Sequence, residues 1–155
     1  MKKYWNYLKY VLEHKKNVFL ECWSDGLYIH AFTHDMSKFS PCEFFSYANY
    51  FYGEHGKLFN GGFVWEFKEH EKAENEFNYG WLHHQRKNKH HWDYWVDSKG
   101  NALQMPNKYI KQMICDWKAM SRKFGDTATD FYLNSKHKMI LHSKTIEILE
   151  SMLKS

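Results

Sequence analysis

Five residues along this chain have the types needed for metal and phosphate chemistry: His14, the doublet His34-Asp35 with Lys38 close behind it, and Asp116. The apolar periodicity around His14 and Asp116 places both on the inward faces of expected helices. An ionised carboxylate buried without a partner costs several kcal/mol, and a divalent cation offsets that cost for several groups at once. The pattern therefore predicts a metal centre inside the protein.

The composition favours a single all-α domain. Aromatic residues make up 19% of the 155 residues, so we expect a core built from rings more than from branched aliphatic side chains. Only two prolines and eight glycines are present, which favours long helices over a turn-rich sheet. We therefore expect residues 1–155 to form one compact single-domain helical bundle of about six to eight helices.

Charge and cysteine usage limit the classes of partner and compartment. The formal charge is +4, which suits an anionic small-molecule substrate and is too small to favour nucleic acid by itself. Cys22, Cys42 and Cys115 are scattered and are expected to be reduced structural thiols of a cytoplasmic protein. No stretch resembles a signal peptide or approaches a membrane span, and the oligomeric state stays open.

Apolar spacing and turn residues predict the positions of the helices. Helices are expected over residues 3–22, 25–35, 40–52, 64–84, 107–122 and 144–154, with a short one after 129 and loops at 53–62, 97–102 and 125–129. His14 shares the inward line of the first helix, and His34 and Asp35 fall at the end of the second. Ser40 and Glu43 have the spacing of a capping box around Pro41.

A histidine-rich tract follows, over residues 83–95, and is expected to continue as a helix or a broken helix. His84 and His91 share a helical face, as do His83 and His90, so only one pair can point inward if the helix is unbroken. With Arg86, Lys87 and Lys89 beside them, these histidines alternatively form a solvated basic face.

The order His, His-Asp, Asp, with a lysine three residues after the doublet, resembles the HD-domain superfamily of helical metal-dependent phosphohydrolases. The resemblance implies that four residues bind one divalent ion from separate helices: His14, His34, Asp35 and Asp116. Two-metal members insert further histidines between the doublet and the last aspartate. This implies that His84, His90 and His91 are candidates for a second ion or for phosphate contacts.

Most of the chain is also similar to an uncharacterised family of small bacterial and phage proteins. The matching segments lie at residues 7–15, 34–44, 88–95, 105–110 and 138–142. This likeness implies a shared fold, and a location in the cytoplasm of a bacterial or phage-infected host cell, but it brings no reaction.

The expected chemistry follows from the ligand set. Histidine and aspartate ligands suit one or two ions of iron, manganese, zinc, cobalt or nickel, and open positions allow a bound water to become a nucleophile. Asp35, Lys38 and His84 are the expected catalytic residues, and Lys38, Arg86 and Lys89 the expected phosphate contacts.

We therefore expect hydrolysis of a phosphomonoester or phosphodiester, with a nucleotide as the favoured substrate. Two alternatives stay open. One is a di-iron oxygenase on the same scaffold. The other is a non-catalytic phage-type protein that binds a nucleotide or a host protein through the basic, aromatic tract at 83–95.

Overall fold

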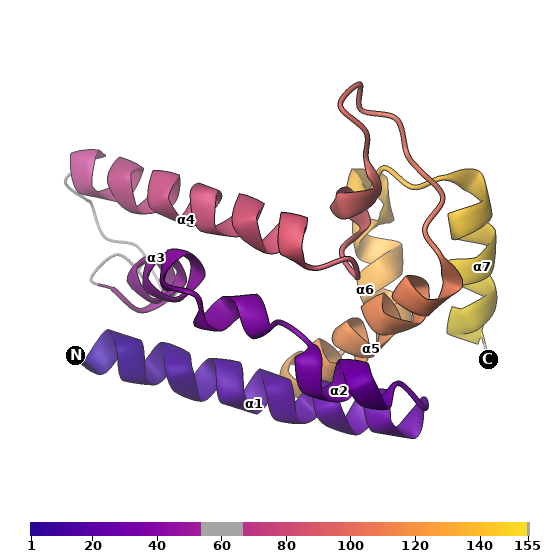
Figure 1. Cartoon of the computed structure of the whole chain (residues 1–155), viewed down its shortest axis with the longest axis horizontal. Coiled ribbons are helices and arrows are strands. Elements are labelled where there is room, and N and C mark those ends of the chain that lie inside the picture. The colour runs from indigo at the N-terminus through magenta and orange to yellow at the C-terminus, as the bar shows by residue number, and fades with distance from the viewer. Residues whose placement is uncertain (54–66, 155) are drawn as a thin grey trace. The chain divides into compact units, whose positions relative to one another are not determined.

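The computed structural model describes residues 1–53 and 67–154 (Figure 1). These residues confirm the all-α class: they form seven α-helices and three 3₁₀ helices, with one isolated β-bridge between Val96 and Ala102. The helices are α1 (Lys2–Ser24), α2 (Tyr28–Thr33), η1 (Met36–Phe39), α3 (Pro41–Tyr52), α4 (Phe67–Lys87), η3 (Trp92–Trp95), α5 (Asn107–Phe124), α6 (Ala128–Ser135), η4 (Lys136–Lys138) and α7 (Ser143–Lys154). Residues 54–62 of the expected loop, and residues 64–66 of the helix expected after it, lie outside the described residues.

The chain divides into two compact units, and a single domain over its whole length stays a prediction. The first unit holds Met1–Glu13 and Asp35–Lys87, and the second holds His14–His34 and Asn88–Ser155. Helix α1 contributes its first half to the first unit and its second half to the second.

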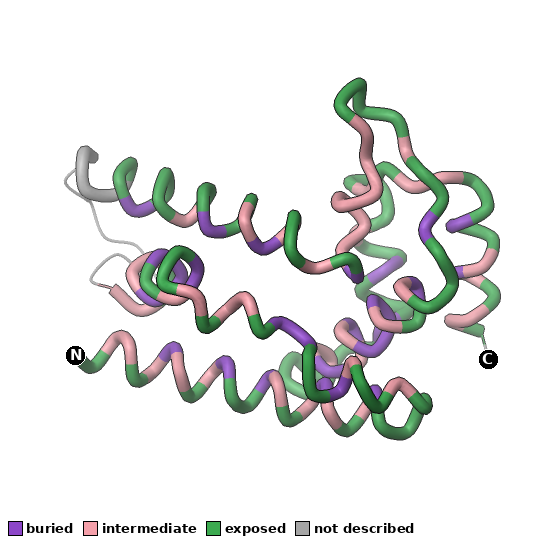
Figure 2. Tube along the Cα trace, in the orientation of Figure 1, coloured by how far each residue is buried: buried purple, intermediate pink, exposed green. Residues whose placement is uncertain are grey.

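Helix α1 has the apolar periodicity expected from the sequence. Tyr7, Val11, His14 and Val18 are all buried, and buried positions recur along one side of the helix (Figure 2). Three aromatic or aliphatic side chains on this line supply the apolar area, so the helix holds its one histidine inside as part of the same face. The prediction that His14 points inward is confirmed.

The first unit is built around the packing of α3 against α4. Its core contains Tyr7 and Tyr47, and the rings of Tyr50 and Phe77 stack with centroids 4.3 Å apart. Gly80 lies at a close contact between the two helices, because a Cβ at this position would collide with the Ser46 hydroxyl. The aromatic core expected from the composition is therefore present, and a glycine permits this close contact between its helices.

The start of α3 differs from the expected capping box. Pro41 occupies the first turn, as expected, but the Ser40 side chain makes no capping hydrogen bond. Glu43 is fully buried, and its carboxylate accepts hydrogen bonds from His83 and His84 of α4. The capping box was wrong because ring nitrogens of α4 reach the carboxylate and draw it into the interior.

The second unit packs α5 against α6 and α7. The buried face of α5 includes Ile110, Met113 and Trp117, and Leu149 of α7 joins the same core. Gly125 ends α5 with a left-handed backbone, φ 81°, which glycine adopts without strain. Thr127 and Asp130 then form a complete capping box at the start of α6.

Helix α2 is shorter than the helix expected over 25–35. It ends at Thr33, His34 has an extended backbone, and Asp35 is left-handed with φ 52°. The Lys15 ammonium donates to the carbonyl oxygens of Phe32 and His34, the latter at 2.7 Å, so it satisfies acceptors at the helix end. The His34-Asp35 doublet therefore lies on a turn instead of on the last turn of a helix.

Candidate metal centre

Three of the predicted ligands converge in the second unit: His14 from α1, His34 after α2 and Asp116 from α5. The Nε2 atoms of the two histidines are 3.1 Å apart, and Asp116 Oδ1 lies 3.1 Å from His14 Nε2 and 3.5 Å from His34 Nε2. Ligand atoms bound at about 2.0–2.2 Å are separated by about 3.0 Å at right angles and about 3.4 Å in a tetrahedron. The three donor atoms therefore have the spacing of three ligands around one metal ion, which is half of a six-ligand coordination shell.

The electrostatics of this triangle also suit a cation. Burial raises the pKa of Asp116, but hydrogen bonds from His14 and His34 outweigh it and hold that pKa well below its ordinary value. The group is therefore an ionised carboxylate beside two imidazole nitrogens. A ring proton can serve only one side of such a triangle, whereas one cation at its centre contacts all three atoms. The donor set thus fits a divalent transition metal.

His34 has a second partner in the same unit. Its Nδ1 lies 3.2 Å from Nε2 of His30, which is on α2 one turn earlier. If Nε2 of His34 binds a cation, Nδ1 carries the proton and donates it to His30. Sequence reasoning gave His30 no role, although its four-residue spacing from His34 on an expected helix was the signal that could have found it.

His90 adds a further ring to this region of the second unit. Its Nε2 is 4.0 Å from Asp116 Oδ2, and its ring lies 4.5 Å from that of His34, centroid to centroid. His30, His34 and His90 each offer one nitrogen within 4.8 Å of the others. The second unit therefore contains two overlapping groups able to hold a metal ion, and they share His34.

The first unit gathers the other predicted residues. Asp35 Oδ2 pairs with the Lys38 ammonium at 2.5 Å, and Asp35 Oδ1 lies 3.5 Å from His84 Nε2. His84 Nδ1 lies 2.8 Å from Glu43 Oε2, and both side chains are almost fully buried. Because Glu43 matched a capping motif, sequence reasoning missed it as part of this group.

The histidine tract is broken, so the expected choice between two inward pairs does not arise. Helix α4 ends at Lys87, and one member of each pair is buried: His84 with 1% and His90 with 2% of its surface exposed. His83 retains 33% of its side-chain exposure. Of the expected phosphate contacts, Arg86 and Lys89 are exposed, whereas Lys38 is largely buried against Asp35.

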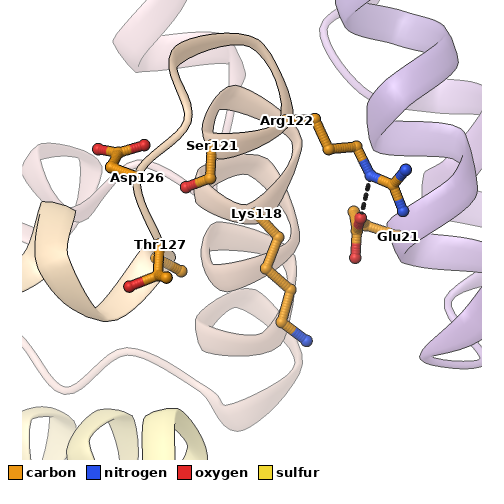
Figure 3. Close-up of a pocket in the computed structure, with 7 residues that line it drawn as sticks. Glu21, Lys118, Ser121, Arg122, Asp126 and Thr127 are labelled. Atoms are coloured by element: carbon orange, nitrogen blue, oxygen red, sulfur yellow. Dashed lines mark hydrogen bonds and ion pairs between the residues drawn. The ribbon is translucent and has the colours of Figure 1, made fainter.

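A pocket in the second unit lies among other residues (Figure 3). It is lined by Glu21, Lys118, Ser121, Arg122, Asp126, Thr127 and Ala128, and Glu21 and Arg122 form an ion pair across it. None of the predicted site residues belongs to this lining. Cys22, Cys42 and Cys115 are free thiols, as expected.

The fold and these distances define an all-α protein with buried histidine–carboxylate groups that can bind a metal ion. A family model that matches residues 3–155 shows that the chain belongs to DUF5662, a family of unknown function. No curated protein and no solved structure matches the chain. Among the described residues, no helix has the length and apolar character to cross a membrane. The expected likeness to an uncharacterised family is thereby confirmed, and the HD-domain resemblance stays a hypothesis.

Proposed function

We propose that this protein is a metal-dependent phosphohydrolase that cleaves a phosphomonoester or phosphodiester, with a nucleotide as the favoured substrate. The observation that carries the proposal is the triangle of His14 Nε2, His34 Nε2 and Asp116 Oδ1, with sides of 3.1, 3.1 and 3.5 Å. Two nitrogens and one oxygen without thiolate suit iron, manganese, zinc, cobalt or nickel better than a structural zinc. A bound ion of this kind supplies a water molecule whose pKa is lowered to about 7.

The protein's own residues would hold this site in a fixed geometry. Asp116 keeps a negative charge that balances a cation, and Lys15 and His30 hold the backbone and ring of His34. Two partners from separate helices, Lys15 of α1 and His30 of α2, therefore hold His34 in place before an ion arrives, as partners behind metal ligands do. Asp35 follows His34 directly in the sequence, and its role as a fourth ligand stays a prediction.

Lysine and arginine side chains are the predicted source of positive charge for the phosphate oxygens. In the first unit, Lys38 is the most buried of the three predicted contacts, and its ammonium pairs with Asp35. Arg86 of the first unit and Lys89 of the second unit are exposed, and their contact with a phosphate stays a prediction. Phosphoester cleavage depends on such charge because negative charge builds up on these oxygens.

The test combines metal analysis with hydrolysis. The parent, His34→Ala, Asp116→Ala and a control, His137→Ala, are purified without chelator, and their metal content is measured. Each is then assayed with each candidate metal on p-nitrophenyl phosphate, bis(p-nitrophenyl) phosphate and a nucleotide panel.

Stoichiometric metal and hydrolysis in the parent and the His137→Ala control, with both lost in the other two variants, would support the proposal. His137 is an exposed histidine of the same unit, so its loss tests for non-specific metal binding. A parent that takes up no ion on reconstitution would refute the proposal, and so would a His34→Ala variant with unchanged metal content and activity.

The second candidate function is a di-iron oxygenase. It is favoured by the second histidine group of this unit, His30, His34 and His90, because an oxygenase of that type needs a second ion close to the first. Two irons per chain and oxygen consumption without phosphoester hydrolysis would select it. Bound metal with neither reaction would select the non-catalytic binding protein.

A further inference from the structure

We propose that Glu43 is a positioning residue that fixes the orientation and tautomer of His84, and thereby prepares Asp35 and His84 to bind a divalent cation in the first unit. The inference rests on the proposed function because it takes His84 to be a functional histidine. It assigns a role to Glu43, which the sequence pattern predicted to be part of a capping box.

Glu43 is a fully buried carboxylate surrounded by donors. Its Oε1 lies 2.6 Å from His83 Nδ1, its Oε2 lies 2.8 Å from His84 Nδ1, and the Ser37 hydroxyl donates to Oε2 at 3.0 Å. Three donors from two elements thus converge on its two oxygens. The carboxylate therefore serves as an acceptor on both oxygens.

The position of Glu43 decides which nitrogen of His84 carries a proton. A carboxylate oxygen at 2.8 Å can only accept, so His84 Nδ1 must be the N–H of this hydrogen bond. The opposite nitrogen, Nε2, then points at Asp35 Oδ1 from 3.5 Å. The other oxygen of Asp35 pairs with Lys38, which fixes the carboxylate so that it presents Oδ1 to the ring.

The pair of Asp35 Oδ1 and His84 Nε2 consists of two electron-pair donors that face each other. A neutral imidazole in this tautomer and a carboxylate repel at this distance unless a proton or a cation lies between them. Their separation of 3.5 Å is close to that of two ligands bound to one tetrahedral ion, about 3.4 Å. A carboxylate behind a ligating histidine also raises the basicity of the ring. A divalent cation is therefore the ligand class that this pair fits.

The packing of α3 against α4 brings Glu43 and His84 together. Gly80 allows close contact at Ser46, and His84 follows Gly80 by one helical turn, as Ser46 follows Glu43. The fold thus positions the carboxylate and the imidazole through a contact one turn away. His83 binds the same carboxylate but is one-third exposed, so it provides a matched control.

The test reads the tautomer of His84 directly. Full-length protein with ¹⁵N-labelled histidine is studied at one fixed pH by long-range ¹H–¹⁵N spectra, before and after addition of Zn²⁺. His84→Gln identifies the signals. The variants are Glu43→Leu, which removes the acceptor at similar volume, Glu43→Gln, which removes only the charge, and His83→Gln as the control.

In the parent and in His83→Gln, we expect a protonated Nδ1 on His84 and a zinc-induced shift confined to its Nε2. In Glu43→Leu, we expect the proton to move to Nε2 and the zinc affinity read from His84 to fall about tenfold to a hundredfold. Should Glu43→Leu fail to fold, Glu43→Gln gives the same measurement with a weaker change in the same direction.

Two results would overturn the inference: an unprotonated Nδ1 in the parent, or variants of Glu43 that leave both the tautomer and the zinc response of His84 unchanged. The second result would reduce Glu43 to a structural contact between α3 and α4. The parent showing the His84 signature without any phosphoester hydrolysis would count against the proposed function alone. The two proposals therefore fail separately.

Discussion

Replacing His30 by alanine should weaken metal binding in the second unit without changing how many ions bind. The change removes the acceptor 3.2 Å from His34 Nδ1, and His34 in the parent has only 1% of its surface exposed. A buried donor left without its acceptor costs about 1–3 kcal/mol. If the loss falls on the bound state, the metal affinity should fall roughly 5- to 150-fold, which overlaps the range observed for partners behind metal-ligating histidines.

The affinity is measured by competition with a chelator of known strength, using Zn²⁺ or Co²⁺ and the full-length protein. His30→Gln supplies an amide oxygen as an acceptor and should restore most of the affinity, whereas His137→Ala should match the parent. Unchanged affinity in His30→Ala would refute the role of His30. Loss of one ion per chain would also contradict it, because His30 would then be a ligand and not a partner of His34.

Three further predictions concern stability. Gly80→Ala should lower the free energy of unfolding by up to about 2 kcal/mol, measured by urea denaturation, because the new methyl group meets the Ser46 hydroxyl and the Cys42 carbonyl oxygen, and this crowding exceeds the gain of about 1 kcal/mol in helix propensity; a variant more stable than the parent would contradict the close approach. Thr127→Ala should cost about 0.5–2 kcal/mol in the same assay, since it removes a capping box with Asp130. The folded state lowers the pKa of Glu43, so this group should stabilise the protein fully above the ordinary carboxyl pKa and progressively less as the pH falls through the folded value. Urea midpoints between pH 7 and pH 3 should therefore fall less steeply for Glu43→Gln than for the parent, and parallel curves would contradict the assignment.

The long elements were predictable because their signal is local and repeated. The line Tyr7, Val11, His14 and Val18 gives the buried face of α1 from sequence alone, since four positions over about three turns of helix agree on it. The end of α2 was not predictable in the same way. The helix ends before His34, where the Lys15 ammonium, nineteen residues earlier in the chain, donates to the carbonyl oxygen of His34. No pattern within the short helix indicates this contact.

The sequence was enough to predict which residues belong to the candidate site, but not which side chains contact one another there. The order of His14, His34 and Asp116 was enough to expect a shared ion, because each lay on or beside an apolar helix face. Glu43 shows the limit of this reasoning. A serine followed three residues later by a glutamate looks the same whether the carboxylate turns back to the helix start or inward, and its deciding partners lie 40 and 41 residues away on α4.

Each unit contains a buried histidine whose Nε2 faces an aspartate, and the two histidines differ in the group behind Nδ1. In the second unit, the ring of His34 directs Nε2 at Asp116 and has an imidazole, that of His30, behind Nδ1. In the first unit, the ring of His84 directs Nε2 at Asp35 and has a carboxylate, Glu43, behind Nδ1. A buried histidine that serves only the fold needs hydrogen-bond partners, but it does not need an unprotonated nitrogen aimed at a carboxylate. The Glu43 carboxylate imposes that arrangement on His84, whereas the imidazole of His30 can either donate to His34 or accept from it. The case for a cation beside the ring is therefore stronger at His84 than at His34. The difference between the partners has its own consequence: a carboxylate makes the ring it holds more basic than an imidazole does, so His84 should be the stronger electron donor of the two.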